Sequence, residues 1–480
     1  MELPADIQAL IEALQQEVAE LRAQNAALLQ EIADLRRRLG LDSSNSGKPP
    51  SSDGLGKKNR KARVAGSLRG LMGSPKKKSG GQIGHKGDTL RPVQKPDKTV
   101  AHHAERCAHC PAALTEAMSV GVERRQVFDL PEPRLEVTEH QGSVYRCECC
   151  QGITRAAFPE GVTNHVQYGP RIKAAAIYLN VQQLIPEDRA SDILCDLLGA
   201  GRLCPASITA WCARKAADLG PVVAHIAALV ARAPVRHLDE TGFRVAGKLR
   251  WLHTASTPAR TAYRVTEKRG DVPEDLEGGV IVHDHFKSYF NLPGLDHALC
   301  NAHHLRELKA LIEIEKEPWA RRMFRLLLKA LKAVRRAVAK GQVALLPRTF
   351  RRFLALYAAI VKRGLEFHEA QPPLTRKSAK ARGRSPRRVG HNLLIRLRDH
   401  VGEVLRFLYD FAVPFTNNLA EQDIRMTKVK MKISGGFRTQ HGATVFADIR
   451  SVLSTARKQG WSLLDTLHAS PTAIIAALPP

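Results

Sequence analysis

Three acidic residues that lie far apart in the chain carry the clearest signal for chemistry. Asp239 and Asp284 each stand at the end of an apolar, strand-like run, and Glu421 stands in the first turn of a helix predicted to begin near Asn417. Carboxylates grouped at strand ends suit hard divalent cations, which prefer oxygen ligands. We therefore predict that Asp239, Asp284 and Glu421 meet and hold Mg²⁺ or Mn²⁺.

The charge of the chain indicates what such ions would act on. Lys and Arg outnumber Asp and Glu by 74 to 47, a formal net charge of +27, which favours a polyanionic partner and nucleic acid above all. Two ions about 3.5–4 Å apart can activate a water or a 3′-hydroxyl and stabilise the leaving oxygen of a phosphodiester. The alternative for any one acid is an ordinary surface residue. Glu240 and Asp423 are weaker candidates, because the first points to the opposite strand face and the second lies about 200° around the helix from Glu421.

The elements that must position these acids form one predicted catalytic domain, residues 233–313 and 411–465. Strand-like segments come first and helical segments later, a pattern typical of a mixed α/β, ribonuclease H-like domain. The segments concerned are residues 235–243, 249–254, 261–265, 279–284 and 296–300 as strands, and 302–309 as a helix. A helical insertion with a basic loop, residues 314–410, interrupts the domain, and residues 466–480 form a C-terminal tail.

Basic residues near these acids are candidates for DNA contact. Arg425, Lys428 and Lys432 lie at i+4, i+7 and i+11 from Glu421, so they share its helix face and are predicted to bind DNA phosphates. Lys76, Lys77 and Lys78 belong to a flexible basic linker, residues 40–95, where contact would be salt-sensitive and independent of sequence. A solvated tether without a specific role is the alternative for the linker.

Nine cysteines include two CxxC pairs, in a segment predicted as a zinc-binding domain, residues 96–165. Cys107, Cys110, Cys147 and Cys150 suit a closed, tetrahedral, structural Zn²⁺ site. Cys149 is the alternative fourth ligand, but Cys150 keeps the two-residue gap of the first pair. A redox pair or unrelated free thiols are the other interpretations.

Residues 7–39 follow a heptad pattern that predicts a coiled-coil dimerisation helix. Apolar residues fill all but one of its core positions, which are Ile7, Ile11, Leu14, Val18, Leu21, Asn25, Leu28, Ile32, Leu35 and Leu39. A buried Asn25 would fix the register of a parallel homodimer at a cost in stability. A single amphipathic helix packed on its own protein is the alternative.

Residues 166–232 are predicted to be helical, and a break at residues 199–205 fits either a helix-turn-helix or a plain bundle. The chain therefore reads as a multidomain α+β protein. The first residues lack the features of a signal peptide, and no run reaches the roughly 18 apolar residues that span a bilayer. We accordingly expect a cytoplasmic protein without a membrane partner.

Taken together, several motifs make the chain resemble the bacterial insertion-sequence-66 transposases, a group of DDE transposases. The resemblance covers nearly the whole chain. Its motifs are Lys48-Pro-Pro-Ser-Ser-Asp53, Gly80-Gly-Gln with Gly84-His85, the CxxC pairs, Tyr168-Gly-Pro170, His237-Leu-Asp-Glu-Thr-Gly242, Val282-His-Asp284, Cys300-Asn-Ala-His303 with Leu305-Arg-Glu307, Asn417-Asn-Leu-Ala-Glu421 and Ser451-Val-Leu-Ser-Thr-Ala-Arg-Lys-Gln-Gly460.

The resemblance implies specific roles and partners. Asp239, Asp284 and Glu421 match the DDE triad, and Cys300 with His303 looks like the CxxH element that follows the second aspartate. The implied activity is cleavage at transposon ends followed by attack of the 3′-hydroxyl on target DNA, in a nucleoid-associated complex that small accessory proteins can join. Two alternatives remain: a zinc-dependent DNA-binding regulator derived from a transposase, and a nuclease of the same fold that cuts without joining.

Overall fold

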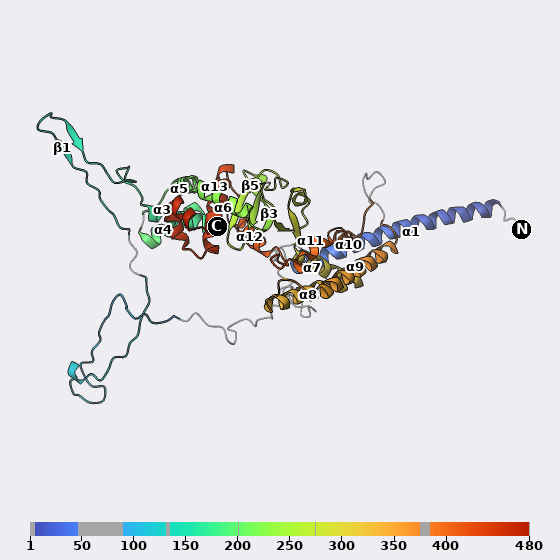
Figure 1. Cartoon of the computed structure of the whole chain (residues 1–480), viewed down its shortest axis with the longest axis horizontal. Helices are drawn as coiled ribbons and strands as arrows, with labels where there is room; N and C mark the ends of the chain where they lie inside the picture. The colour runs from blue at the N-terminus through green and yellow to red at the C-terminus, as the bar shows by residue number, and fades with distance from the viewer. Residues whose placement is uncertain are drawn as a thin grey trace. The chain divides into compact units, whose positions relative to one another are not determined.

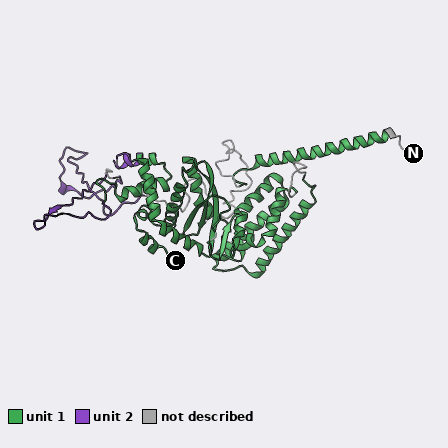
Figure 2. Cartoon of the chain, turned by 90° about the horizontal axis from the view of Figure 1, so that it is seen from above, with its two compact units in different colours: residues 1–75, 163–191, 204–480 green, residues 76–162, 192–203 purple. Residues whose placement is uncertain are grey.

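The computed structural model describes residues 5–46, 90–130, 135–199, 201–273, 275–374 and 385–479. The chain divides into two compact units (Figure 2). The first comprises residues 1–75, 163–191 and 204–480, and the second comprises residues 76–162 and 192–203. Lys76, Lys77 and Lys78 lie outside the described residues, as does most of the basic loop at 376–388.

A five-stranded mixed sheet, in the order β5-β4-β3-β6-β7, forms the centre of the first unit. The strands are β3 (Val235–Val245), β4 (Lys248–Ser256), β5 (Thr261–Thr266), β6 (Val280–His283) and β7 (Asp296–Leu299). The first three form the predicted antiparallel meander, whereas β6 runs parallel to β3 and β7 parallel to β6. Gly279 has a φ of +71°, and a Cβ there would lie 2.7 Å from the Pro234 carbonyl oxygen, so glycine is needed where β6 meets β3.

Two long helices, α12 (Asn418–Ser434) and α13 (Gln440–Lys458), pack on the meander (Figure 1). Their contact is apolar: Phe243, Leu252 and Tyr263 from the strands are buried with Ile424 and Ala447 from the helices. Fully burying one such side chain stabilises the fold by about 1.5–3 kcal/mol. This packing fixes α12 over β3, the strand that carries Asp239.

The helical insertion forms its own apolar core beside the sheet. It follows α7 (Asn301–Ala310) and a π-helical turn (Leu311–Glu315), and its helices are α8 (Pro318–Ala339), α9 (Pro347–Glu369), α10 (Val389–Asp399) and α11 (Val401–Leu405), which gather in Figure 1. Trp319, Met323, Leu327 and Leu394 are among the buried residues at its centre. Because α7 contributes Leu305 and Leu308 to the same core, the insertion holds α7 against the sheet domain.

The helices before the sheet are α3 (Pro170–Ile177), α4 (Glu187–Leu198), α5 (Pro205–Asp218) and α6 (Gly220–Ala231). α5 buries Ile208 and Trp211 and packs on α13, as does α6, so the inner face of α5 serves the core of the first unit. Residues 466–480, expected only as a tail, contain the second half of α14 (Leu463–His468) and the whole of α15 (Pro471–Ala477). Ser470 caps α15, and Ile474 is buried.

The predicted coiled-coil segment is one continuous helix, α1 (Ala5–Gly40), whose apolar heptad residues are exposed. The end of α1 and the residues after it contact the π-helical turn and α7: Arg37 pairs with Glu315, Asn45 donates to Glu313 at 3.2 Å, and Lys309 of α7 donates to Ser44 at 3.1 Å. The dimer stays a prediction. None of the helices in the described part of the chain has the length and apolar character needed to cross a membrane.

The second unit holds little regular structure among its described residues. β1 (Val144–Arg146) pairs antiparallel with β2 (Ile153–Arg155), and one 3-10 turn covers Glu116–Met118. Cys147 and Cys150 lie in the turn that joins the two strands.

Candidate active site

Asp239 lies within β3, and Asp284 directly follows the neighbouring parallel strand β6. Val235 pairs with Val280, and His237 pairs with Val282, each two residues before its aspartate. Asp239 Oδ1 accepts a hydrogen bond from the Glu240 amide at 2.9 Å, and Asp284 Oδ1 accepts one from the Phe286 amide at 2.8 Å.

Asn417 links the start of α12 to the strand that carries Asp239. Its side-chain nitrogen donates to the Leu238 carbonyl oxygen at 2.6 Å, and its Oδ1 lies 2.9 Å from His237 Nδ1. Its backbone amide donates to the sulfur of Cys300 at 3.1 Å. Asn417 is fully buried, so these bonds lie away from water and fix the position of Glu421, one turn further along the helix. The local sequence marks Asn417 only as a residue at the start of a helix.

Glu421 projects toward the start of α7. Its Oε1 lies 3.7 Å from Cys300 Sγ and 3.7 Å from His303 Nδ1, and its Oε2 lies 3.4 Å from a guanidinium nitrogen of Arg306. The structure thus brings the predicted CxxH pair, Cys300 and His303, to the third predicted acid. Arg306 is an additional site residue; it stands in the motif Leu305-Arg-Glu307, but the sequence pattern gave it no role.

The electrostatics show that the other acids act on Asp239. Burial raises the pKa of Asp239 to about 8, and the charges of Glu240, Glu421 and Asp284 add to that effect in this order. A group of carboxylates that repel one another and are short of water is a donor set that a divalent cation would neutralise. The residues present therefore fit hard cations with oxygen ligands.

A cavity of about 270 Å³ opens beside Asp284. Cys300 and His303 line it together with three cationic side chains, Arg269, Lys287 and Arg396. Arg396 pairs with Glu307 across this space. The cavity therefore places cationic side chains next to Asp284, the second of the three predicted acids.

Glu240, the acid next to Asp239, has its own ion-pair and hydrogen-bond partners. It forms an ion pair with Arg269 at 2.6 Å and accepts a hydrogen bond from the Tyr289 hydroxyl at 2.5 Å, and its side chain is almost fully buried. Arg269 also lies over the Phe286 ring, 4.1 Å from its centroid. These contacts give Glu240 a structural role at the edge of the site.

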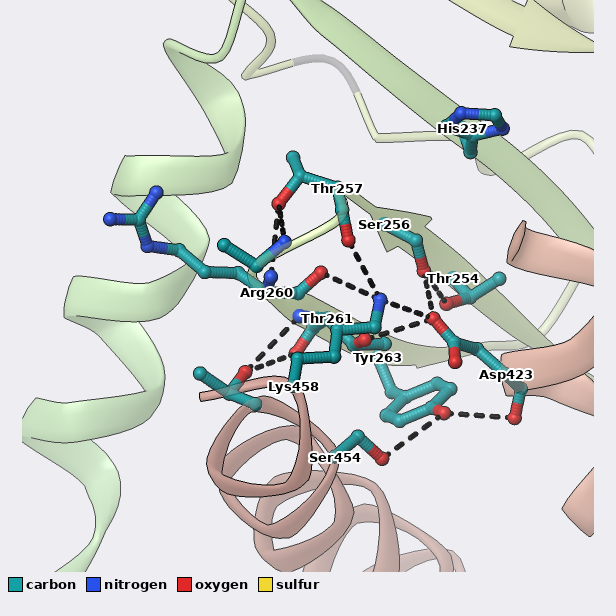
Figure 3. A network of polar contacts seen from close by, with 12 residues as sticks. His237, Thr254, Ser256, Thr257, Arg260, Thr261, Tyr263, Asp423, Ser454 and Lys458 are labelled. Atoms are coloured by element: carbon teal, nitrogen blue, oxygen red, sulfur yellow. Dashed lines mark hydrogen bonds and ion pairs between the residues drawn. The ribbon is translucent and has the colours of Figure 1, made fainter. Parts of the chain in front are cut away.

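Asp423 is the centre of a polar network that anchors α12 (Figure 3). Its Oδ2 accepts hydrogen bonds from Ser256 at 2.6 Å, Thr261 at 2.9 Å and Lys458 at 2.7 Å. Tyr263 also donates to the Asp423 carbonyl oxygen at 2.9 Å. The network joins α12 to β4, β5 and α13, so Asp423 holds the helix while Glu421 faces α7.

The predicted DNA-binding stripe lies on the outside of α12. Arg425, Lys428 and Lys432 are all exposed, whereas Lys430 on the same helix is buried near the Phe437 ring. The three exposed cations are therefore free to meet phosphates, although no contact with DNA is shown. Helical spacing was enough to find them.

The CxxC pairs of the second unit have the local geometry of zinc knuckles. The amides of His109 and Cys110 lower the pKa of the Cys107 thiol, and the amides of Cys150 and Cys149 lower that of Cys147. A hydrogen bond between the side chains of Cys147 and Cys150 also lowers the pKa of Cys147. Each pair fits half of a tetrahedral site. Among the described residues, however, the one group of three or more ligands within 4.8 Å lies elsewhere, so the pairs are not brought together here.

Comparisons with known families match three parts of the chain. Residues 165–445, well over half of the chain, match the family described as Transposase IS66 family. Residues 104–151 match the zinc-finger binding domain of transposase IS66, and residues 1–91 match a family of unknown function (DUF6444). The comparison with curated proteins gives no match.

These matches define the class of protein: a transposase with a DNA-binding role and a zinc-finger domain. The zinc-finger domain indicates structural zinc. The chain belongs to the IS66 transposase family. Its match to a DDE transposase domain also indicates an enzyme that depends on a divalent metal.

Proposed function

We propose that this transposase cleaves DNA strands at the ends of its element and joins the freed 3′-hydroxyl to target DNA, in a ribonuclease H-like domain. Asp239, Asp284 and Glu421 would hold two Mg²⁺ or Mn²⁺ ions. One observation carries the proposal: the charges of Glu421, on α12, and of Asp284, which directly follows β6, both act on Asp239 in the neighbouring strand β3. That arrangement is a three-carboxylate site with oxygen donors.

The residues around the three acids would position the acids and the DNA and would not take part in the reaction themselves. When bound, the ions would activate the attacking water or 3′-hydroxyl and stabilise the leaving oxygen. Asn417 keeps α12 at a fixed distance from β3, and the Asp423 network prevents that helix from turning. The exposed stripe of Arg425, Lys428 and Lys432 would hold the DNA backbone along the same helix.

The second unit would hold structural Zn²⁺ through Cys107, Cys110, Cys147 and Cys150. A closed site of four thiolates leaves no position for chemistry, so the ion would stabilise a small unit that has little apolar core. Its role would be to present basic residues to DNA. The match over residues 104–151 supports this assignment.

We further propose that α1 forms a parallel coiled coil with a second copy. Its heptad residues are exposed, from 38% at Ile11 to 76% at Leu39, a stripe that pairing would cover. The contacts of residues 37–45 with the π-helical turn would connect this dimer to the sheet domain. Asn25→Val should relax the oligomer specificity, giving mixed masses in light scattering. An unchanged dimer mass after removal of residues 1–40 would contradict the coiled coil.

The decisive experiment incubates the full chain with DNA carrying the element's ends, with Mg²⁺ or Mn²⁺, and scores nicked and joined products. Asp239→Asn, Asp284→Asn and Glu421→Gln should each abolish cleavage while DNA binding persists. Glu267→Gln, at an exposed acid that pairs with Arg250, is the matched control and should keep activity. Nicked products without joined ones would point to a nuclease. Binding without any cleavage by the wild-type chain would point to a regulator.

A further inference from the structure

One cluster of side chains has a different chemistry from the proposed all-oxygen site. Cys300, His303 and Glu421 form the one group within the described residues whose three potential ligand atoms all lie within 4.8 Å of one another. Cys300 immediately precedes α7, His303 lies in the first turn of α7, and Glu421 lies in the first turn of α12. Sulfur, imidazole nitrogen and a carboxylate oxygen together suit a borderline-soft divalent ion rather than Mg²⁺.

The thiol of Cys300 donates a long hydrogen bond to Glu421, and the distances among the three groups leave room for an ion. Cys300 Sγ and His303 Nδ1 each lie 3.7 Å from Glu421 Oε1, and His303 Nδ1 is buried without a hydrogen-bond partner. A buried nitrogen is rarely left in that state, because the loss of a partner costs about 1–3 kcal/mol. With metal–ligand bonds of about 2.0–2.3 Å, tetrahedral geometry gives ligand separations of about 3.3–3.8 Å. The observed separations match that range.

The surroundings of Cys300 favour a metal-bound thiolate. The sulfur is buried, accepts the Asn417 amide at 3.1 Å, and faces the amides of His303 and Ala302 at the start of α7. Backbone donors at a helix N-terminus stabilise negative charge on sulfur. Burial, and next the charge of Glu421, raise the pKa of the free thiol to about 12, so an ion would enter by displacing the proton.

The charges also balance. A thiolate and a carboxylate together offset a divalent cation, so Arg306, 3.4 Å from the other oxygen of Glu421, would face a neutral centre. Cys300 and His303 line the cavity that contains Asp284, which leaves room on that side for a water or a further ligand as the fourth donor.

We infer that Cys300, His303 and Glu421 form a separate binding site for Zn²⁺ or a similar ion, which shares Glu421 with the proposed site for Mg²⁺. One consequence rests on the proposed function: an ion held here would withdraw Glu421 from the aspartates. Added Zn²⁺ should then reduce Mg²⁺-dependent cleavage at least severalfold.

The test uses Co²⁺ as the probe and needs neither DNA nor cleavage, so its failure is distinguishable from failure of the proposed function. Full-length protein with zinc already in its cysteine-rich unit is titrated with Co²⁺. We expect one additional ion per chain, with the visible bands of tetrahedral cobalt and a near-ultraviolet charge-transfer band from a single thiolate. Cys300→Ser should remove the charge-transfer band, and His303→Gln should weaken Co²⁺ binding by at least about tenfold.

Cys212→Ser is the matched control. Cys212 is also a buried lone thiol, and burial likewise raises its pKa to about 12, but its sulfur lies 3.9 Å from Asn180. This variant should keep the cobalt spectrum. The inference is overturned if Co²⁺ gives no thiolate band, or if the band persists in Cys300→Ser. Should Cys300→Ser fail to fold, an unchanged Co²⁺ affinity in folded His303→Gln overturns it equally.

Discussion

Replacing Asp239 with asparagine should stabilise the metal-free protein and remove its response to divalent cations. Burial is the main cause that raises the pKa of Asp239 from 3.8 to about 8. Between these two values the unfolded chain has lost the proton while the folded chain retains it. The stability of the metal-free protein must therefore fall as the pH rises from about 4 through about 8. Asparagine carries no charge, and its oxygen can still accept the Glu240 amide.

The size of the effect follows from the shift. A change of about four pKa units corresponds to about 6 kcal/mol at 1.36 kcal/mol per unit. Asp239 is still partly exposed, so water screens part of the penalty, and we expect about 2–3 kcal/mol at pH near 8. For a domain of this size, that gain raises the melting temperature by about 3–5 °C.

Thermal unfolding measures both the gain in stability and the response to divalent cations. It compares the wild type, Asp239→Asn and Glu267→Gln at low and high pH, with and without Mg²⁺ or Mn²⁺. The wild type should gain stability from the ion at high pH, and Asp239→Asn should begin higher and gain nothing. The exposed control should follow the wild type. The reasoning is refuted if Asp239→Asn melts below the wild type in metal-free buffer at high pH, or if Mg²⁺ stabilises both equally.

Three further predictions concern the surrounding structure. Asp423→Ala leaves Lys458 without its carboxylate partner and should cost about 3–5 kcal/mol in urea unfolding, and a loss below about 1 kcal/mol would contradict the anchoring role. Arg425→Ala should lower the slope of log affinity for DNA against log salt by about one and weaken all sequences alike, so a sequence-selective loss would argue against phosphate contact. Removing zinc with a chelator should make residues 90–162 more sensitive to protease while the sheet domain resists, and unchanged digestion would speak against structural zinc.

Local pattern was enough to predict most of the elements. Alternating apolar residues located the strands of the meander, and the heptads located α1. The position of Glu421 in the first turn of a helix was predicted correctly because the Asn-rich start and the following periodic residues are local signals. Asp284 directly follows β6 and Glu421 lies in the first turn of α12, whereas Asp239, which was expected at the end of a strand, lies within β3.

Contacts between distant segments could not be predicted in this way. Asn417 reads locally as a helix-start residue, yet its bonds go to β3 and to Cys300. Asp423 was set aside because of its direction on the helix, and that same direction carries it to Lys458 on α13. Such pairings depend on how the sheet and helices pack, information that no window of sequence contains.

The two acids of α12 illustrate how one helix can serve both structure and chemistry. Glu421 and Asp423 are two residues apart and so point about 200° from each other. Asp423 is held by three hydrogen bonds from β4, β5 and α13. Glu421 instead has contacts of 3.4 to 3.7 Å, longer than good hydrogen bonds. Asp423 therefore fixes the rotation of the helix. That rotation sets the position of Glu421, which remains available to a cation.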